Sequence, residues 1–303
     1  MSDVTAFIGT GRMGAPMAQN LARKANALGR RIRVFDRSPE AAALCRDAGA
    51  EVADSLEAVL DGADVVFTMV PAGPDVKALL MDAGGVLDKA APGALIVDSS
   101  TIDVATAQEV ASAAKARGFR MIDAPVSGGV PGAENATLTF MVGGDTADLE
   151  TVRPQLEAMG AKVVHCGPSG MGEAAKICNN MVTGIATIAV AECYAIGEGL
   201  GLDPKILYDV VSTSSGQTAQ GVNSPPVKGL SPTSAVERDF APGFTIALML
   251  KDLRLAQAAA KQIGQASPLG AQAAEVYALA DGAGLANLDS SAVYKLIAGK
   301  LKE

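Results

Sequence analysis

The sequence predicts an α/β fold, in which a doubly wound parallel sheet is followed by an all-helical second domain. In the first half, short apolar runs alternate with alanine-rich amphipathic stretches, a pattern typical of strands and helices in turn. The apolar runs are nearly continuous, as expected for strands covered on both faces. After residue 167 only helical periodicity remains. We therefore expect a first domain over 1–167 and a helical domain over 168–303.

The individual elements follow from the same periodicities. Strands are predicted at 5–9, 32–36, 64–70, 94–100, 119–125, 137–144 and 161–167. Helices of the second half are predicted at 171–200, 203–214, 245–264, 268–282 and 289–302. The proline-rich stretch 224–244 is predicted to be a loop between them.

Composition excludes several classes of function. The chain has 303 residues with 25 basic and 33 acidic side chains, a net charge of -8, which disfavours nucleic acid and anionic membrane as partners. Its four cysteines are scattered and it has one histidine, so neither a zinc site nor a disulfide framework is expected. The first residues already have a strand pattern and no leader signal, which favours a cytoplasmic protein.

One segment, 181–197, is apolar enough to resemble a membrane span. It is shorter than the roughly 20 residues that a bilayer requires, and Glu192 interrupts it. We therefore interpret it as a helix buried on nearly all sides within the protein.

The stretch FIGTGRMGAPMAQNL carries Gly9, Gly11 and Gly14 in the order G-x-G-x-x-G. It follows the first predicted strand and opens the first helix. In that setting the first glycine permits a tight turn, the second lets a pyrophosphate approach, and the third lets helix and strand pack closely. The helix N-terminus adds unpaired N–H groups and a positive dipole end. This pattern predicts a dinucleotide cradle.

Asp36, at the end of the second predicted strand, is the acidic residue expected about 20 residues beyond such a cradle. Its carboxylate is suited to the ribose hydroxyls and would repel a ribose phosphate. NAD is therefore the predicted cofactor, with neighbouring Arg37 able to soften the preference over NADP.

Hydride transfer from an alcohol needs a base for the hydroxyl proton. His165 is one candidate, although a lone histidine at a strand end is more often a loop residue. Lys176 is the better one, because it shares a helix face with Asn180 and precedes an unusually apolar helix. A lysine base at neutral pH requires a pKa lowered by burial or by a neighbouring cation, such as an oxidised nicotinamide ring.

Two further stretches carry polar groups in suitable places. In DAPVSGG, the hydroxyl of Ser127 and the backbone of Gly128 and Gly129 follow a strand end and could hold a carboxylate. In FTIALMLKDLRLAQ, Lys251 and Asp252 lie within an apolar helix. Taken singly, the first stretch is an ordinary loop and the second an ordinary lysine at a helix surface.

Together these stretches resemble the β-hydroxyacid dehydrogenase family. The family patterns G-x-G-x-M-G-x-P-M-A-x-N-L, D-A-P-V-S-G-G, G-x-x-G-x-G-x-x-x-K-x-x-N-N and K-D-L-x-L-A are met at 9–21, 123–129, 167–180 and 251–256. The resemblance covers essentially the whole chain. It implies a Rossmann-like domain, a long interdomain helix and a helical domain that assembles homodimers or homotetramers.

The resemblance also implies roles for matching residues. Lys176 would be the general acid/base, and Asn180 would orient the substrate hydroxyl or carboxylate. The implied substrate-binding residues are Ser127, Gly128, Gly129, Phe244 and Lys251. The implied cofactor-binding residues are Gly9, Gly11, Arg12, Met13, Gly14, Asp36, Arg37, Val70, Pro71, Asp75, Ser100, Thr101, Lys251 and Asp252.

Within the family, the chain is most similar to the 3-hydroxyisobutyrate dehydrogenase branch, which implies NAD-dependent oxidation of 3-hydroxyisobutyrate to methylmalonate semialdehyde. It departs from that branch after SSGQ, where a tryptophan is usual and this chain has none. A tartronate or succinic semialdehyde reductase using NADPH is the alternative within the family. A non-catalytic NAD-binding or imine-reducing relative is the alternative of another class, which Lys176 and Asn180 disfavour.

Overall fold

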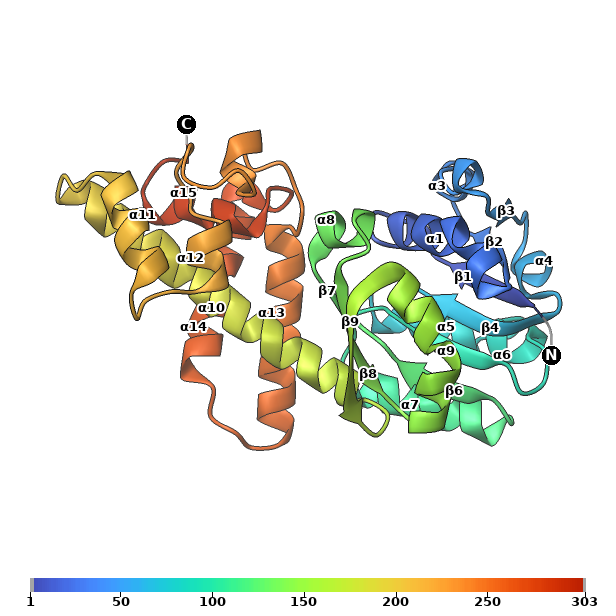
Figure 1. Ribbon diagram of the computed structural model, residues 1–303. Helices are drawn as coiled ribbons and strands as arrows, with labels where there is room; N and C mark the ends of the chain where they lie inside the picture. The colour runs from blue at the N-terminus through green and yellow to red at the C-terminus, as the bar shows by residue number, and fades with distance from the viewer. Residues whose placement is uncertain (1–2, 302–303) are drawn as a thin grey trace. The chain divides into compact units, whose positions relative to one another are not determined.

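The computed structural model describes residues 3–301 (Figure 1). The chain divides into two compact units, here called the sheet unit, Met1–Lys176, and the helical unit, Ile177–Glu303. Each unit has a hydrophobic core of its own, and each is described by itself below.

The sheet unit is built on a single twisted sheet. Its strands are β1 (Val4–Ile8), β2 (Arg31–Phe35), β3 (Glu51–Val52), β4 (Ala63–Thr68), β5 (Leu95–Asp98), β6 (Arg120–Asp123), β7 (Val126–Ser127), β8 (Leu138–Gly143) and β9 (Gly160–Gly167). The order is β3-β2-β1-β4-β5-β6-β8-β7, and β9 pairs with β8. The order reverses direction at β1, next to β4, which is where open α/β sheets bind ligands.

The sheet is mixed, which corrects the expectation of a wholly parallel one. Strands β1 to β6 pair in parallel, whereas β8 runs antiparallel to β6 and β7. Residues 124–137, between β6 and β8, contain β7 and a short helix and make no crossover back to the edge of the sheet where β6 begins. A parallel neighbour needs such a crossover, so the returning strand lies antiparallel.

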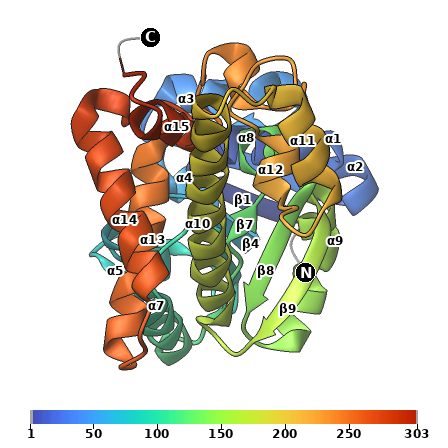
Figure 2. The same cartoon turned by 90° about the vertical axis from the view of Figure 1, so that its left-hand side faces the viewer.

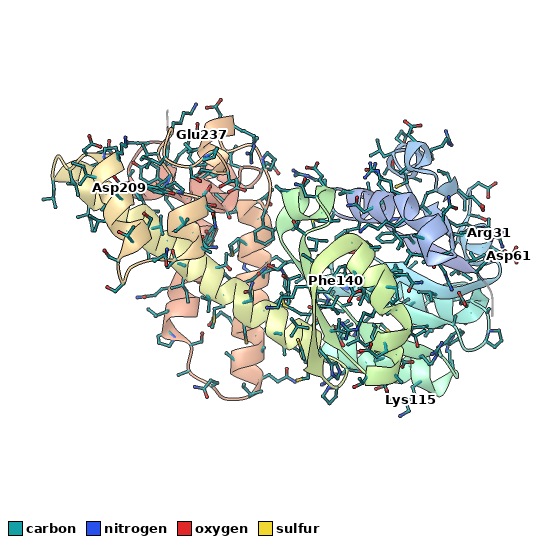
Figure 3. The ribbon with its side chains drawn as sticks, viewed as in Figure 1. Arg31, Asp61, Lys115, Phe140, Asp209 and Glu237 are labelled. Atoms are coloured by element: carbon teal, nitrogen blue, oxygen red, sulfur yellow. The ribbon has the colours of Figure 1, made fainter. Side chains whose placement is uncertain are left out.

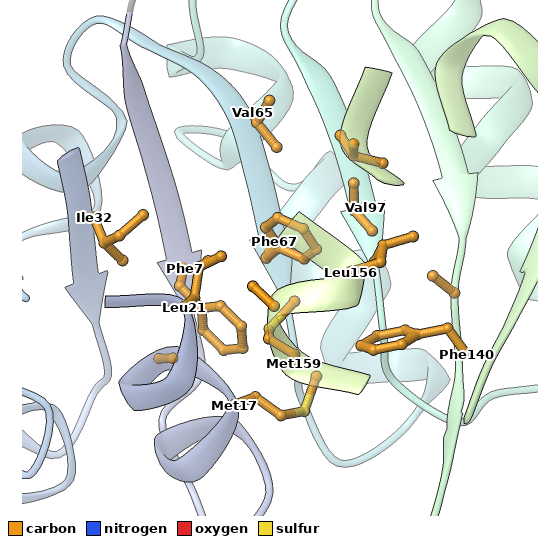
Figure 4. Close-up of a cluster of buried hydrophobic side chains, with 14 of the residues drawn as sticks. Phe7, Met17, Leu21, Ile32, Val65, Phe67, Val97, Phe140, Leu156 and Met159 are labelled. Carbon is orange, nitrogen blue, oxygen red and sulfur yellow. The ribbon is translucent and has the colours of Figure 1, made fainter. Parts of the chain in front are cut away.

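Helices cover both faces of this sheet. They are α1 (Gly14–Arg23), α2 (Ala25–Leu28), α3 (Pro39–Ala43), α4 (Leu56–Leu60), α5 (Gly73–Met81), α6 (Val86–Lys89), α7 (Val104–Ala116), α8 (Gly129–Glu134) and α9 (Thr146–Met159). Because successive strand side chains alternate between faces, Phe7 packs with α1 and α9 while its neighbours Ala6 and Ile8 pack with α5 and α7. Figure 4 shows the first of these layers, in which the rings of Phe7 and Phe67 stack 5.9 Å apart.

The helical unit contains most of α10 (Met171–Gly199), which begins in the sheet unit, and every later element. The α-helices among them are α11 (Pro204–Thr213), α12 (Ala219–Asn223), α13 (Ile246–Gln262), α14 (Pro268–Ala280) and α15 (Val293–Ile297), and the short turns are η2 (Ala235–Arg238), η3 (Asp281–Leu285) and η4 (Ser290–Ala292). The core forms where α10, α13 and α14 lie side by side (Figure 2), with Tyr194 and Tyr277 as its largest buried side chains.

At the surface, Asp209 and Glu237 are exposed, whereas Phe140 in the sheet unit is fully buried (Figure 3).

Helix α10 is less enclosed than the sequence suggested. Within residues 3–301 it is the one helix long and apolar enough to cross a membrane by length and composition, and 39% of its apolar window is buried. Ile188 and Tyr194 face the core, while Val182 and Ile196 are exposed. The core covers only one face of this apolar helix. The expectation that it is buried on nearly all sides is therefore wrong for this chain.

Candidate functional site

The glycine-rich turn between β1 and α1 has a backbone that only glycine accommodates. Gly9 has a φ of +93°, and a Cβ there would overlap the carbonyl oxygen of Met69. A Cβ on Gly14 would overlap the carbonyl oxygen of Gly9. Strand and helix can therefore approach as closely as they do only with glycine at both positions.

Gly11 differs from the other two glycines because a Cβ there would meet nothing within 4 Å. The space beside Gly11 is open, as a pyrophosphate approaching the backbone requires. Arg12 is exposed and Met13 half-buried at the start of the ten-residue helix α1. The turn therefore fits the phosphates of a dinucleotide at a helix N-terminus.

Asp36 follows β2 and is tied directly to the glycine turn. Its Oδ2 accepts the N–H of Thr10 at 2.7 Å, and its Oδ1 accepts the N–H of Ser38 at 2.9 Å. The half-buried carboxylate thus has a set position beside the cradle, with further lone pairs available to ribose hydroxyls. Arg37, the next residue, is exposed.

The ends of β4 and β5 carry further residues that are expected to bind the cofactor. The Ser100 hydroxyl accepts the N–H of Val70 at 3.0 Å and donates to Oδ1 of Asp98 at 2.6 Å. Thr68 donates to the same oxygen at 2.7 Å. Asp98 is fully buried, and burial raises its pKa. This carboxyl group therefore holds Val70 and Ser100, two residues expected along the nicotinamide half.

Three other predicted cofactor residues lie close to these strand ends in the sequence. Pro71 is exposed directly after Val70, Asp75 is half-buried in the first turn of α5, and Thr101 is half-buried directly after Ser100.

The glycine turn yields a prediction that separates folding from binding. We expect Gly14→Ala to lower the Tm by several degrees and to weaken NAD binding at least about tenfold, because the new Cβ displaces the turn. We expect Gly11→Ala to keep the Tm and to lose NAD affinity, because its Cβ meets no protein atom but occupies the phosphate space. Thermal melts and NAD titrations of both variants check this, and unchanged NAD affinity in Gly11→Ala would contradict it.

The predicted carboxylate loop follows β6. Ser127 is half-buried in β7, and Gly128 and Gly129 have φ values of +135° and +61° at the start of α8. Positive φ values at both positions favour glycine, and backbone N–H groups in a turn before a helix can bind an anion. The loop is therefore suited to a carboxylate.

Lys176 lies in the second turn of α10 and is only 6% exposed. The first turn of the same helix is held by Asp123, the last residue of β6. Oδ1 of Asp123 accepts the N–H of Gly170 at 2.7 Å, and Oδ2 accepts the N–H of Glu173 at 3.0 Å. A buried lysine thus follows a helix start that is anchored to the sheet.

Asn180 lies one turn beyond Lys176, in the helical unit, and belongs to a chain of polar contacts there. Its Nδ2 donates to Oδ2 of Asp252 at 2.5 Å, and its Oδ1 accepts from Asn179 at 3.1 Å. The Lys251 ammonium lies 3.4 Å from Oδ1 of Asp252. Asp252 is 1% exposed. The predicted residues Asn180, Lys251 and Asp252 are therefore brought together by α10 and α13.

Phe244 lies in the turn before α13, and its backbone is held by Asp289. Oδ2 of Asp289 accepts the N–H of Phe244 at 3.2 Å. His165, the alternative base, lies exposed on β9 with its Nε2 2.9 Å from the carbonyl oxygen of Gly144. The contact of its ring is thus with a backbone carbonyl and not with Lys176, Asn180 or the carboxylate loop.

Sequence reasoning missed the supporting carboxylates. Asp98 and Asp123 lie inside the predicted strands 94–100 and 119–125 and are the last residues of β5 and β6, and Asp289 is the first residue of the last predicted helix, 289–302. The sequence signal for Asp98 and Asp123 was an acidic residue directly after an apolar run. Burying a carboxylate there costs free energy unless hydrogen-bond donors compensate for it. Asn179 is part of the pattern met at 167–180, but the resemblance implies no role for it.

Comparison with known proteins shows which family the chain belongs to. Residues 4–167 match the family model for the NAD-binding domain of 6-phosphogluconate dehydrogenase. Residues 170–297 match the model for the NAD-binding region of NADP-dependent 3-hydroxyisobutyrate dehydrogenase. A probable 3-hydroxyisobutyrate dehydrogenase from Mycobacterium tuberculosis is 46% identical over 95% of this chain and 95% of its own length. The chain belongs to the 3-hydroxyisobutyrate dehydrogenase family.

Two further comparisons bear on the substrate. An NAD-dependent L-serine dehydrogenase from Pseudomonas aeruginosa is 43% identical over 96% of each chain. The solved structure of Mycobacterium tuberculosis 3-hydroxyisobutyrate dehydrogenase with L-serine is 45% identical, with a TM-score of 0.89 over 98% of this chain and 99% of that one. The protein is thus an NAD-dependent hydroxyacid dehydrogenase with a Rossmann-like sheet unit and a helical second unit, acting on a small molecule.

Proposed function

We propose that the protein oxidises (S)-3-hydroxyisobutyrate to methylmalonate semialdehyde with NAD, with Lys176 as the general acid/base. The observation that supports this most is the burial of Lys176 in the second turn of α10, directly after a helix start held by Asp123. A lysine removed from water is suited to proton transfer, whereas an exposed one is an ordinary surface cation.

In the proposed reaction, Nζ of Lys176 takes the proton of the substrate hydroxyl. The cradle of Gly9, Gly11 and Asp36 would hold NAD, which would supply the hydride acceptor for the carbon that carries this hydroxyl. In the reverse direction Lys176 returns the proton to the carbonyl oxygen. The Ser127 hydroxyl and the backbone N–H groups of Gly128 and Gly129 bind the substrate carboxylate, which fixes the orientation of the reacting carbon.

Asn180 orients the substrate through its amide, as the family resemblance implies. Its amide geometry is set by a donor on one side, Asn179, and an acceptor on the other, Asp252. Lys251, beside Asp252, supplies a positive charge for a substrate or cofactor anion. Phe244, held by Asp289, contributes apolar surface to substrate binding.

L-serine is a second candidate substrate, which the serine dehydrogenase relative and the solved relative with L-serine support. Both acids carry a hydroxyl on the carbon beyond C2, so the same carboxylate loop and the same base serve either one. They differ at C2, where one has a methyl group and the other an ammonium group. The choice between them therefore depends on the side chains around C2, including the 213–228 segment that lacks the usual tryptophan.

Initial rates with NAD and NADP across 3-hydroxyisobutyrate, L-serine, 3-hydroxypropionate, glycerate and 4-hydroxybutyrate test this proposal. We expect the highest kcat/KM with 3-hydroxyisobutyrate and NAD, because Asp36 lies where an NADP phosphate would be repelled. A higher kcat/KM with L-serine would keep the mechanism and replace the substrate. A preference for NADP with glycerate or 4-hydroxybutyrate, which are the alcohol products of tartronate and succinic semialdehyde reduction, would favour the reductase alternative. No activity with any acid would contradict the proposal.

We further propose a cytoplasmic homodimer or homotetramer assembled through the helical unit. Large exposed apolar side chains of that unit support the assembly: Ile196, Leu200, Ile206, Val210, Ile263, Leu269 and Leu279. The four cysteines are all free, which is consistent with a reducing compartment. Light scattering of the purified protein tests the assembly, and a monomer at micromolar concentration would contradict it.

A further inference from the structure

Asp123 is a buried carboxylate for which the proposed reaction has no direct use. It ends β6, is 4% exposed, and is enclosed by backbone from two other elements. A Cβ on Gly143 of β8 would lie 2.5 Å from its Oδ1, and a Cβ on Gly172 of α10 would lie 2.7 Å from its Oδ2. Glycine at both positions lets strand and helix close directly around this side chain.

The two oxygens of Asp123 hold the start of α10 at two points. One accepts the N–H of Gly170, just before the helix, and the other accepts the N–H of Glu173 in its first turn. N–H groups in a first turn lack partners within their own helix and need an acceptor from elsewhere. Most capped helices of this chain obtain that acceptor from the residue directly before them, as Asp145 does for α9. The start of α10 obtains it from a strand 47 and 50 residues away.

This arrangement bears directly on Lys176. Lys176 follows Glu173 by three residues, so the two lie on the same side of the helix, one turn apart. Two separate hydrogen bonds to one carboxylate resist both translation of the first turn along the sheet and rotation about the helix axis. The position of the lysine relative to the carboxyl edge of the sheet therefore depends on Asp123.

The charge state of Asp123 suits this role at neutral pH. Burial raises the pKa of Asp123 to about 6, while the N–H groups of Gly170 and Glu173 oppose that shift and Asp98 adds to it. The group is ionised at pH 7, and both oxygens then act as acceptors. The dipole of the 29-residue helix also favours negative charge at this end.

We propose that Asp123 is a positioning residue, which sets the place of Lys176 by holding the first turn of α10 on the end of β6. The consequence for turnover rests on the proposed function, since it depends on Lys176 being the acid/base. The two hydrogen bonds from α10 to Asp123 do not depend on the role of Lys176, and their effect on the helix can be measured without any substrate.

A neighbouring carboxylate gives a useful contrast. Asp98 is paired in register with Asp123 on the adjacent strand β5, and it holds Val70 through Ser100 on the expected nicotinamide side. If Asp98 positions a cofactor-binding residue and Asp123 positions Lys176, variants of the two residues should differ in their effect on NAD affinity. Asp98→Asn is expected to weaken NAD binding, whereas Asp123→Asn is expected to leave it within about twofold.

Asp123→Asn is the principal test, because it keeps the shape of the side chain but replaces one acceptor oxygen with an NH2 group that faces an N–H. We expect amide exchange in the peptide covering 170–176 to rise by roughly fivefold or more, as for a lost helix cap. We expect kcat to fall by about ten- to a hundredfold, as for a base displaced by about 1 Å. The matched control is Asp145→Asn, since asparagine retains the single hydrogen bond that Asp145 accepts from Ala147, and both values should stay at wild type.

The possible results are separable. Faster exchange with unchanged kcat would overturn the positioning role, because the cap would then be structural only. Unchanged exchange would overturn the proposal whatever the kcat. If wild type oxidises none of the hydroxy acids, the proposed function fails, and exchange at 170–176 alone decides whether Asp123 holds the helix. If Asp123→Asn does not fold, Asp123→Ser, a smaller side chain with one acceptor, is measured in the same way with the same expected direction.

Discussion

Replacing Lys176 with alanine is expected to reduce kcat by about 10³-fold or more, which places it within the range measured for loss of a general acid/base. The reason is that Lys176 is the proposed acceptor of the hydroxyl proton, and the exposed His165 contacts a backbone carbonyl instead. NAD affinity should stay within about twofold, because the cradle of Gly9, Gly11 and Asp36 is formed by other elements.

Steady-state rates and NAD titrations of Lys176→Ala measure both quantities. The matched control is Lys162→Ala, since Lys162 is an exposed lysine of β9 and its removal should leave kcat unchanged. Near-normal turnover in Lys176→Ala would contradict the mechanism and return His165 as the candidate base, to be tested by His165→Ala.

Asp252→Asn is expected to reduce kcat/KM by about 30- to 100-fold, through its effect on Asn180. Either orientation of the new amide places its Nδ2 against a donor, because the Nδ2 of Asn180 lies 2.5 Å from one oxygen of Asp252 and the Lys251 ammonium lies 3.4 Å from the other. Asn180 has no favourable way to turn its amide over, because its Oδ1 is needed by Asn179 on the other side. The change also leaves Lys251 without its neighbouring negative charge. Removing one partner of a buried ion pair typically costs about 3 kcal/mol of free energy, which is the basis for the size of the expected loss.

The control for Asp252→Asn is Asp209→Asn, an exposed aspartate of α11 whose charge is removed without a buried partner. A double-mutant cycle of Asp252→Asn with Asn180→Ala should show strong coupling, because the two changes interrupt one contact. Additive losses of kcat/KM would mean that Asp252 acts independently of Asn180, which would refute this explanation.

Local patterns were sufficient for most of the fold. All seven strands predicted from apolar runs are present, with ends shifted by one or two residues. The glycine turn could be located because the demands on Gly9 and Gly14 are set by neighbours close in the sequence or on adjacent strands. Helix α15 is shorter than expected, Val293–Ile297, because the preceding residues form a 3₁₀ turn on Asp289.

Features that depend on distant residues were not predictable in the same way. The two-residue strands β3 and β7 are too short for any periodicity, and β7 exists only because β8 returns beside it. The bond between Asn180 and Asp252 joins residues 72 apart, and the bond between Asp123 and Gly170 joins residues 47 apart. A motif shows that such residues occur together, but their geometry depends on how the chain folds back.

The register of β5 and β6 places Asp98 and Asp123 directly opposite each other, and this has a thermodynamic consequence. Besides Asp98, Cys166 on β9 interacts electrostatically with Asp123, and the titratable residue Glu173 on α10 donates its backbone N–H to it. With a pKa of about 6 against 3.8, Asp123 binds a proton in the folded chain at pH 5 that the unfolded chain releases. Its contribution to stability is complete below pH 3.8 and is lost as the pH rises through about 6, a change of about 3 kcal/mol. Unfolding in that interval is therefore coupled to proton release, so the unfolding enthalpy contains the ionisation enthalpy of whichever buffer takes up the proton.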